Sequence, residues 1–397
     1  MVIVKRSRLL ILAAATCWIG WAATADADWA ACQRQPTRAC LLEEALRGDG
    51  APLAGKDRLD VLILAGAIVH PEYATAADID EAVRQAKDPS GYNYANLAIQ
   101  GLVAGNRTQQ AADLVASFPP RSVELHLAFT QLVRALAKAG DLDTATALLD
   151  RMAPTFEPTT RDMLAHSSLV QSVRMLAEIG RTEDAILVMT TQKNLTGLDV
   201  PEMWLSVAQA YISRGEAWRA QRVLDLAGRM LEENRRYAMG SAEEYNRWSL
   251  MSLSALRGDP EAVKTALRGL GPQPADSLSA RYRTEGHQRL VISLLKARQF
   301  ELALEVAKAA PDTVRDQELW LVNYENTQNG RIDDARAVMT LFSEKMHSSL
   351  RAGAVRNVAV AMVKAGKLAA AVEMAAQESN LTNRKGILFA MAQALPQ

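Results

Sequence analysis

The sequence predicts an all-α protein, an α-solenoid of stacked helix-turn-helix repeats. Three observations point to this fold class: apolar residues recur with helical spacing, a glycine and an alanine recur together along most of the chain, and the prolines fall between the helical patterns. The alternating apolar pattern and the paired turn signals of β-strands are missing, so no sheet is expected.

A reference repeat stands at residues 204–227. Its apolar residues form two helical stripes on either side of a glycine: Trp204, Val207, Ala208 and Tyr211, then Gly215, then Ala220, Leu224 and Ala227. Glycine allows a helix to end in a left-handed residue, and alanine lets two helices cross closely. One such pair cannot bury both stripes, so the pattern predicts a stack of pairs.

Looser copies of this repeat follow at intervals of 32 to 43 residues. The alanine stands five residues after the glycine in five copies: Gly140/Ala145, Gly180/Ala185, Gly215/Ala220, Gly330/Ala335 and Gly366/Ala371. Three copies deviate: Gly105/Ala111 has one extra residue, Gly258/Ala262 has one fewer, and Arg298/Ala303 lacks the glycine. These intervals are typical of helical-hairpin repeats and predict about eight helical pairs.

The reference repeat resembles the tetratricopeptide repeat (TPR). The matching pattern is Trp204-x2-Val207-Ala208-x2-Tyr211-x3-Gly215-x4-Ala220-x3-Leu224-x2-Ala227, with Glu232 where the family closes its pattern with proline. The resemblance covers residues 90–376, and residues 56–88 are a candidate for a degenerate first pair. It implies a right-handed superhelix with a concave binding face, and it says almost nothing about the ligand.

The N-terminal segment has the pattern of a secretory signal peptide. MVIVKRSR is basic, LLILAAATCWIGWAATA is apolar, and the small residues Ala23 and Ala25 suit cleavage after Ala25. A transmembrane anchor is disfavoured by the short apolar run, and a lipid anchor at Cys17 by the residues before it. We therefore expect residues 1–25 to be removed and the protein to be periplasmic in a bacterium with two membranes, with secretion as the second choice.

The exported chain is close to neutral. Residues 1–25 carry Lys5, Arg6 and Arg8 and no acidic residue, so their removal takes 45 basic and 45 acidic side chains to 42 and 45. This balance gives no strong field to attract nucleic acid or an anionic membrane. No other apolar run is long enough to span a bilayer, so we expect neither a nucleic-acid partner nor stable membrane insertion after cleavage.

Cys32 and Cys40 predict a disulfide that staples an N-terminal cap over residues 26–55. Two cysteines close together in an exported chain favour a bridge. One unbroken helix would hold them about 12 Å apart, and Pro36 supplies the necessary break. On the entropy model such a bridge contributes roughly 2.5 kcal/mol. The alternative is two unpaired buried thiols, and no histidine lies near enough in sequence to suggest a metal site.

The repeats occupy residues 56–397. Residues 48–58 are interpreted as a linker, residues 59–70 and 75–87 as a first helix pair, and residues 381–395 as a C-terminal capping helix. The prolines that separate the helical patterns are Pro89, Pro119, Pro120, Pro154, Pro158, Pro201, Pro260, Pro272, Pro274 and Pro311. The continuous repeat predicts one elongated body rather than several globular domains.

No catalytic or metal-binding motif stands out. The closest two of His70, His126, His166, His287 and His347 are 40 residues apart, and HExxH, CxxC, Gly-x-Ser-x-Gly and Gly-rich phosphate-loop motifs are missing. We therefore expect no catalytic residue, metal or cofactor. An active site assembled from distant repeats remains open as the alternative.

Candidate binding residues come from the TPR resemblance, which places the first and fifth residues after the Trp204 equivalent on the concave face. The candidates from these positions are Arg134, Arg174, Gln209, Trp248, Trp320 and Tyr324. The two arginines suit a peptide carboxylate, and the aromatic side chains suit flat apolar contacts. The alternative is that the tryptophans are packing residues shifted by one position.

Two further features lie beside the reference repeat. Arg219, Arg222, Arg229 and Arg236 share one helix face, either as an anion-binding stripe or as a solvated convex face moderated by Asp225, Glu232 and Glu233. Residues 228–250 form the longest segment between repeats, which predicts an extended helix pair or an exposed loop. An insertion of this kind often marks a contact surface, with sequence drift as the alternative.

These features predict a non-catalytic periplasmic scaffold or assembly factor that binds a protein or peptide on the concave face of the solenoid. The alternative function is an enzyme, or a substrate-binding arm of one, that acts on a cell-envelope polymer such as peptidoglycan or another polysaccharide.

Overall fold

The structure is a computed structural model. It describes residues 29–47, 51–65, 74–88, 91–119, 123–152, 170, 173–191, 199–236, 238–271, 274 and 276–396. These residues are mostly helical and contain no β-strand, so the all-α prediction is confirmed for them. The predicted signal peptide, residues 1–25, lies outside them. Within the described ranges, no helix combines the length and the apolar character that crossing a membrane requires.

Short helices precede the region of repeats: α1 (Trp29–Arg34), α2 (Arg38–Leu46), α3 (Gly55–Leu64) and α4 (Ala76–Ala86). The hairpin helices are α5 (Tyr92–Ala104), α6 (Thr108–Ala116), α7 (Val123–Lys138), α8 (Leu142–Met152), α10 (Thr182–Thr191), α11 (Asp199–Ser213), α12 (Ala217–Arg235), α13 (Ser241–Leu256), α14 (Pro260–Arg268), α15 (Ser277–Lys296), α16 (Phe300–Ala309), α17 (Asp312–Gln328), α18 (Ile332–Met339), α19 (Ser348–Lys364) and α20 (Leu368–Ala376). The partner of α10 is helical at residues 170 and 173–178, and α21 (Leu381–Ala394) is the last helix.

One kind of turn joins the two helices of each hairpin. A left-handed residue ends the first helix at Asn106, Gly140, Gly180, Gly215, Gly258, Arg298, Gly330 and Gly366. In each turn the next amide donates to the carbonyl five residues earlier, as Glu216 N does to Tyr211 O at 2.9 Å. This is the Schellman arrangement, which bonds the last carbonyls of a helix. The glycine frame in the sequence therefore marks real helix ends.

The structure explains two of the three deviating copies. In the first copy the left-handed residue is Asn106 rather than Gly105, which restores the five-residue spacing to Ala111. In the fifth copy the residue five positions after Gly258 is Val263, which is completely buried. Val263 therefore takes the crossing position that a buried alanine takes in the other copies, and Ala262 does not.

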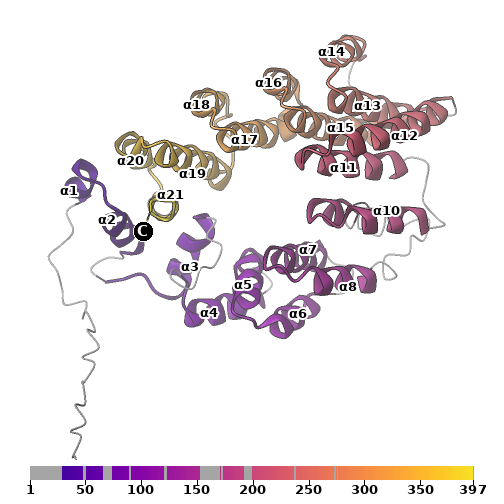
Figure 1. Cartoon of the computed structure of the whole chain (residues 1–397). Helices are drawn as coiled ribbons and strands as arrows, with labels where there is room; N and C mark the ends of the chain where they lie inside the picture. The colour runs from indigo at the N-terminus through magenta and orange to yellow at the C-terminus, as the bar shows by residue number, and fades with distance from the viewer. Residues whose placement is uncertain are drawn as a thin grey trace, which may run out of the picture.

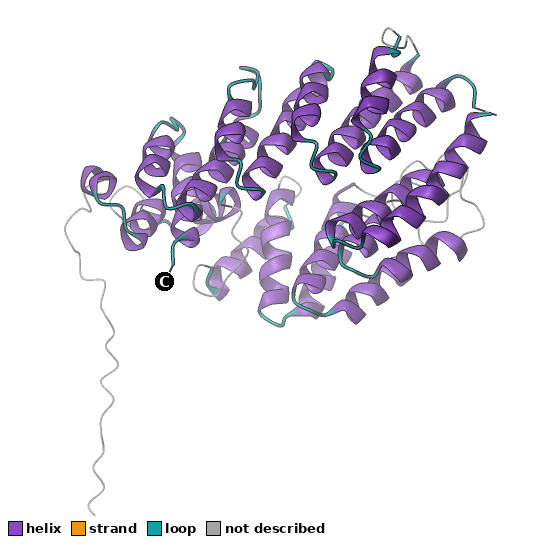
Figure 2. Cartoon of the chain, turned by 45° about the horizontal axis from the view of Figure 1, so that its top comes forward, coloured by secondary structure: helices purple, strands orange, loops and turns teal. Residues whose placement is uncertain are grey.

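The hairpins follow one another along an arc (Figure 1). The first helices α11, α13, α15, α17 and α19 pack in succession, and the most extensive contact joins α13 to α15. The second helices α14, α16 and α18 lie on the outer side of the arc in Figure 1. The view in Figure 2 shows the hairpins side by side.

The two ends of the arc meet. Helices α2 and α3 pack on α21, α3 also touches α19, and α1 touches α20. We call these contacts the seam. One hydrophobic cluster crosses it, from Leu41 in α2 to Phe389 in α21. This differs from the elongated body that the repeat pattern predicts, and α21 joins the two ends instead of covering a free one.

Two cations of the C-terminal helices bind the C-terminal ends of N-terminal helices at the seam. Lys385 Nζ donates to the carbonyl of Arg47, the C-cap of α2. Arg356 Nη1 donates to the carbonyl of Leu64, the last residue of α3, at 2.8 Å. Cations are favoured there because a helix C-terminus carries partial negative charge, typically by about 0.3–1 kcal/mol.

The N-terminal cap is held by the predicted disulfide. Cys32 in α1 is bonded to Cys40 in α2, with the two Cα atoms 5.8 Å apart. The chain breaks between the helices at Pro36, and Thr37 caps α2 by accepting from the amide of Cys40 at 3.2 Å. The predicted linker is shorter than expected, because α3 already begins at Gly55.

Candidate functional site

Arg134 and Arg174 are brought together, as the sequence predicts, but both bind one acidic side chain. Arg134 Nη2 lies 3.1 Å from Glu178 Oε2, and Arg174 Nε lies 3.0 Å from Glu178 Oε1. All three side chains are partly exposed, so the contacts contribute little to stability. A ligand carboxylate would have to replace Glu178 to bind both guanidinium groups.

Trp320 and Tyr324 form a stacked pair on α17. Their ring centroids are 5.7 Å apart and the rings are 10° from parallel. Tyr324 is 37% exposed, while Trp320 is half-buried against Gly353 of α19. Of the two rings, Tyr324 is the one available for contact with another molecule.

Trp248 is not a binding residue, and its prediction is wrong. Its side chain is 0% exposed, and its indole nitrogen donates to Glu244 Oε1 at 2.9 Å. The ring packs on His287, with centroids 4.4 Å apart. The repeat frame cannot show this, because α15 approaches α13 most closely at this position. Gln209 also bonds within the protein, since its side chain donates to Ser293 Oγ at 3.2 Å.

Two ion pairs connect α13 with its neighbours, which the sequence reasoning missed. Arg283 of α15 binds Glu244 of α13 at 2.6 Å, and both side chains are nearly inaccessible. Arg289 of α15 lies 3.2 Å from the partly exposed Glu202 of α11, and Tyr245 of α13 donates to the same carboxylate at 2.9 Å. Removing Arg283 or Glu244 would leave an uncompensated buried charge, so the first pair in particular holds α13 and α15 in register.

Two buried titratable groups on α15 and α17 have strongly shifted pKa values. Burial, with the nearby Arg283 cation, lowers the pKa of His287 to about 4. Burial raises the pKa of Glu318 to about 8, and neither of its carboxylate oxygens has a hydrogen-bond partner in the described part of the chain. Glu318 is completely inaccessible, so it cannot reach a substrate as a general acid.

The arginine stripe on α12 faces outward. Arg219 is paired with Glu216 at 2.8 Å, whereas Arg222, Arg229 and Arg236 are exposed, and no ion pair is found for them among the described residues. Asp225, expected to moderate the stripe, instead binds Arg257, the C-cap of α13, at 3.1 Å. The exposure of Arg222, Arg229 and Arg236 agrees with a solvated helix face.

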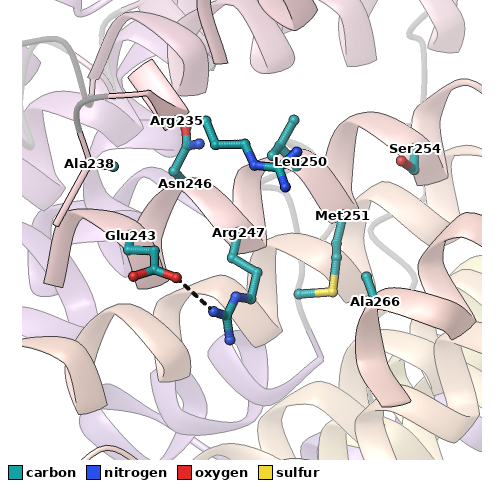
Figure 3. Close-up of a pocket in the computed structure, with 9 residues that line it drawn as sticks. All are labelled: Arg235, Ala238, Glu243, Asn246, Arg247, Leu250, Met251, Ser254 and Ala266. Atoms are coloured by element: carbon teal, nitrogen blue, oxygen red, sulfur yellow. Dashed lines mark hydrogen bonds and ion pairs between the residues drawn. The ribbon is translucent and has the colours of Figure 1, made fainter. Parts of the chain in front are cut away.

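A pocket of about 360 Å³ opens between α12, α13 and α14 (Figure 3). It is lined by Arg235, Ala238, Glu243, Asn246, Arg247, Leu250, Met251, Ser254 and Ala266. Most of these residues belong to the segment 228–250 that the sequence singles out. The structure shows this segment as an extension of α12 to Arg235 followed by the start of α13.

The pocket combines apolar walls with charged groups at one end. Leu250, Met251 and Ala266 supply the apolar surface. At the charged end, Arg247 Nη2 lies 3.0 Å from Glu243 Oε1, the contact drawn as a dashed line in Figure 3. Arg235 is 68% exposed. Such a lining suits an amphipathic anion, since a guanidinium recognises a carboxylate and the walls accept apolar groups.

The described residues contain no group of three or more histidine, cysteine, aspartate or glutamate side chains placed to hold a metal ion. The pocket lining has neither histidine nor cysteine. The groups that the pocket does offer are two guanidinium groups, a carboxylate and apolar side chains.

Comparison with known proteins identifies no family. No family model matches this chain, and no curated protein matches it in sequence. Among solved structures the chain is similar to Ton1535 from Thermococcus onnurineus NA1, at 13% identity, covering 81% of this chain and 94% of that chain, with a TM-score of 0.27. A likeness at that TM-score carries no argument, so the TPR resemblance rests on the repeat residues themselves.

Proposed function

We propose that this protein is a non-catalytic scaffold that binds a protein or peptide partner in the periplasm, and that its hairpins form a TPR-like, right-handed α-solenoid. The observation that carries the proposal is the recurrence of one hairpin, with the same left-handed turn and a small buried crossing residue. Such an array exposes long helix faces to a partner, and it needs no bound group or reactive side chain for that task.

The exposed side chains support binding rather than chemistry. Tyr324 offers a ring already ordered by stacking, which reduces the entropy lost when a partner covers it. Arg134 and Arg174 offer two guanidinium groups held close together by Glu178. Aromatic and arginine side chains are the types that most often dominate binding energy at interfaces.

Export is supported by the N-terminal pattern and by the disulfide. A basic start, an apolar run and small residues before Asp26 suit a signal peptide, and a disulfide persists in an oxidising compartment. The mass of the protein isolated from the periplasm tests this part of the proposal. A chain that begins at Asp26 would support it, and a chain that keeps residues 1–25 would oppose it.

The partner is sought by photo-crosslinking in the producing cell. A photoreactive amino acid replaces Tyr324 in one variant and the exposed Glu305 of α16 in a control variant, and captured species are identified by mass spectrometry. One dominant protein captured only from position 324 supports a scaffold. Arg134→Ala combined with Arg174→Ala then tests whether the two guanidinium groups contribute to its affinity.

Two outcomes would contradict the proposal. Capture of glycan fragments would move the function to the cell-envelope polymer, and equal capture from positions 324 and 305 would show that Tyr324 does not mark a binding face. Circular dichroism of each variant confirms that its fold is intact.

A further inference from the structure

The hairpin α13/α14 differs from its neighbours in how its second helix packs. Helices α12, α16 and α18 each contact the first helix of their own hairpin and that of the next one. Helix α14 packs on α13 and makes no comparable contact with another described helix. In the hairpins of α12, α16 and α18 the second helix packs between two successive first helices. Here α13 and α15 instead pack mainly on each other.

The residues at two contacts of this hairpin differ from those of the other hairpins. Val263 of α14 is completely buried at the position where the other copies carry a buried alanine. On the other side of α13, Gly286 lets α15 approach so closely that a Cβ atom there would lie 2.3 Å from Trp248 Cγ. Helix α13 thus packs closely on α15 at Trp248, and other residues of α13 border the pocket.

The arginines of the pocket are only partly neutralised. The nearest carboxylate to Arg235 is that of Glu232 at 3.7 Å, which is too long for a hydrogen bond. Arg247 is bound by Glu243 and lies 4.0 Å from Glu244, but Glu244 is already bound by Arg283. The pocket lining therefore carries two guanidinium groups and one carboxylate, that of Glu243, which is paired with Arg247.

An exposed methionine follows the pocket residue Ala238 in the chain. Leu250 and Met251 lie next to the charged end, and Met239, in the turn between α12 and α13, is 83% exposed. An exposed methionine of this kind is typical of adaptable binding surfaces, because its side chain is unbranched and polarizable. A volume of about 360 Å³ is in the range of ligand sites and suits one or two side chains of a peptide.

We propose that this pocket binds a short segment of the partner polypeptide in which a carboxylate stands beside an apolar side chain. The carboxylate binds Arg235 and Arg247, and the apolar side chain packs on Leu250, Met251 and Ala266. The proposal rests on the proposed scaffold function and names the chemistry that it recognises. The charge complementarity of the two arginines selects an acidic segment over a basic one.

The test uses the purified exported protein and a phage-displayed library of random short peptides. We expect enriched peptides to place Asp or Glu beside Leu, Ile, Phe or Met. Arg235→Glu with Arg247→Glu should weaken their binding by about tenfold or more, because both carboxylate contacts become repulsive. Arg229→Glu with Arg236→Glu, the same charge change on two exposed arginines outside the pocket lining, should leave affinity within about twofold, and added salt should weaken wild-type binding.

A second variant tests whether the peptide enters the pocket, without changing the charge of its lining. Ala266→Trp fills the pocket and leaves both arginines in place, so we expect it to abolish binding of the same peptides while the melting temperature stays close to that of the wild type. Enriched peptides that are basic, or that bind all variants equally, would overturn the proposal, as would a selection that enriches nothing.

The in-cell experiment distinguishes the two proposals. A photoreactive amino acid at Leu250 should capture the same partner that position 324 captures, through an acidic segment. Capture from position 324 but not from position 250 would leave the scaffold function standing and reject the pocket. Capture from neither position would reject both.

Discussion

Glu318 is a buried acid whose ionisation opposes folding. Its pKa in the folded protein is about 8, against an ordinary value of 4.5, because burial disfavours the carboxylate. Between these two pH values the folded chain keeps a proton that the unfolded chain has released. Stability therefore falls as pH rises through this window, and the proton is bound in both states below it.

Glu318→Gln should remove this penalty. We expect the variant to be more stable than the wild type at pH 8, by on the order of a few kcal/mol, and to match it near pH 4. Thermal unfolding followed by circular dichroism at several pH values measures the difference. Glu305→Gln on the surface of α16 is the control, and a gain that does not depend on pH would contradict this origin.

His287 lowers stability as pH falls, whereas Glu318 lowers it as pH rises. Its pKa is lowered from 6.5 to about 4, so between these pH values the unfolded chain binds a proton at this histidine and the folded chain does not. The contribution of His287 to the free energy of unfolding is therefore complete above pH 6.5 and is lost as pH falls toward 4. Between pH 4.5 and 6.5 the two effects oppose each other, and above pH 6.5 only the loss from Glu318 remains, so together they predict a stability maximum at mildly acidic pH.

The candidate residues show what a repeat pattern can and cannot reveal at this scale. Arg134 and Arg174 meet, because equivalent positions of adjacent repeats are neighbours in space. Trp248 comes from the first of the two predicted concave positions, whereas the two arginines come from the fifth, and Gly286 brings α15 against its ring. A sequence position gives a face of a helix, and the neighbour that covers this face depends on contacts between hairpins.

At the scale of elements, the turn from α15 to α16 is strained. Arg298 has a φ of +58°, the left-handed conformation that glycine supplies in most of the other turns. A side chain with a Cβ costs about 1–2 kcal/mol there, and glycine does not.

Arg298→Gly should therefore stabilise the protein by about 1 kcal/mol, after allowing for the greater freedom of glycine in the unfolded chain. Urea unfolding measures the change. Arg298→Ala is the matched control, since it removes the same charge but keeps the Cβ atom, and it should show no gain. Equal effects of the two substitutions would assign the change to the lost charge instead.

The close contact of α13 with α15 depends on Gly286. Gly286→Ala places a methyl group inside the indole ring of Trp248, and the ring cannot move without breaking its bond to Glu244. We expect destabilisation of about 1–3 kcal/mol or more. Gly271→Ala, where an added Cβ meets nothing within 4 Å, should be nearly neutral in the same urea titration. A neutral Gly286→Ala would show that the two helices can separate freely.

The pairing of helices could be predicted because its signals are local. A turn residue and a buried crossing residue lie within a few positions of each other, so their spacing survives in the sequence. The pocket could not be predicted, because its lining comes from α12, α13 and α14 together, and no local spacing encodes how these helices pack. The crossing residue of α14 was also missed, since it is Val263 where alanine was expected at Ala262. A one-residue shift of this kind is visible only once the turn is located at Gly258.

At the scale of the whole molecule, the seam is a joint that small changes should open. A Cβ atom at Gly386 would lie 2.7 Å from Leu64 Cβ and 3.2 Å from the amide nitrogen of Ala65. Gly386→Val should therefore separate α21 from α3. We expect a larger radius of gyration in small-angle X-ray scattering, with little loss of helix by circular dichroism.

Thr382→Val, on the exposed side of α21, is the control and should keep the wild-type dimensions. If Gly386→Val left both dimensions and stability unchanged, the ends would not be joined as the structure shows. Reduction of the Cys32–Cys40 bond should loosen only α1, whose single buried residue is Cys32.

The seam could not be predicted from the sequence. Its two cation contacts join residues 292 and 338 positions apart, and neither Arg356 nor Lys385 belongs to a repeated pattern. The last helix was predictable from its apolar residues, and it is present as Leu381–Ala394. Which helices it covers depends on the accumulated curvature of the hairpins before it, which no local spacing encodes.

Joining the ends changes where the molecule should unfold locally. In a linear array the outermost repeats lack a neighbour and fray first, so hydrogen exchange is fastest at the two ends. Here α2 and α21 shield each other, and the array has no outermost repeat in the described region. Amide protection should therefore be nearly even from α2 to α21, and its minimum should lie at an internal irregularity such as α14 rather than at the chain ends.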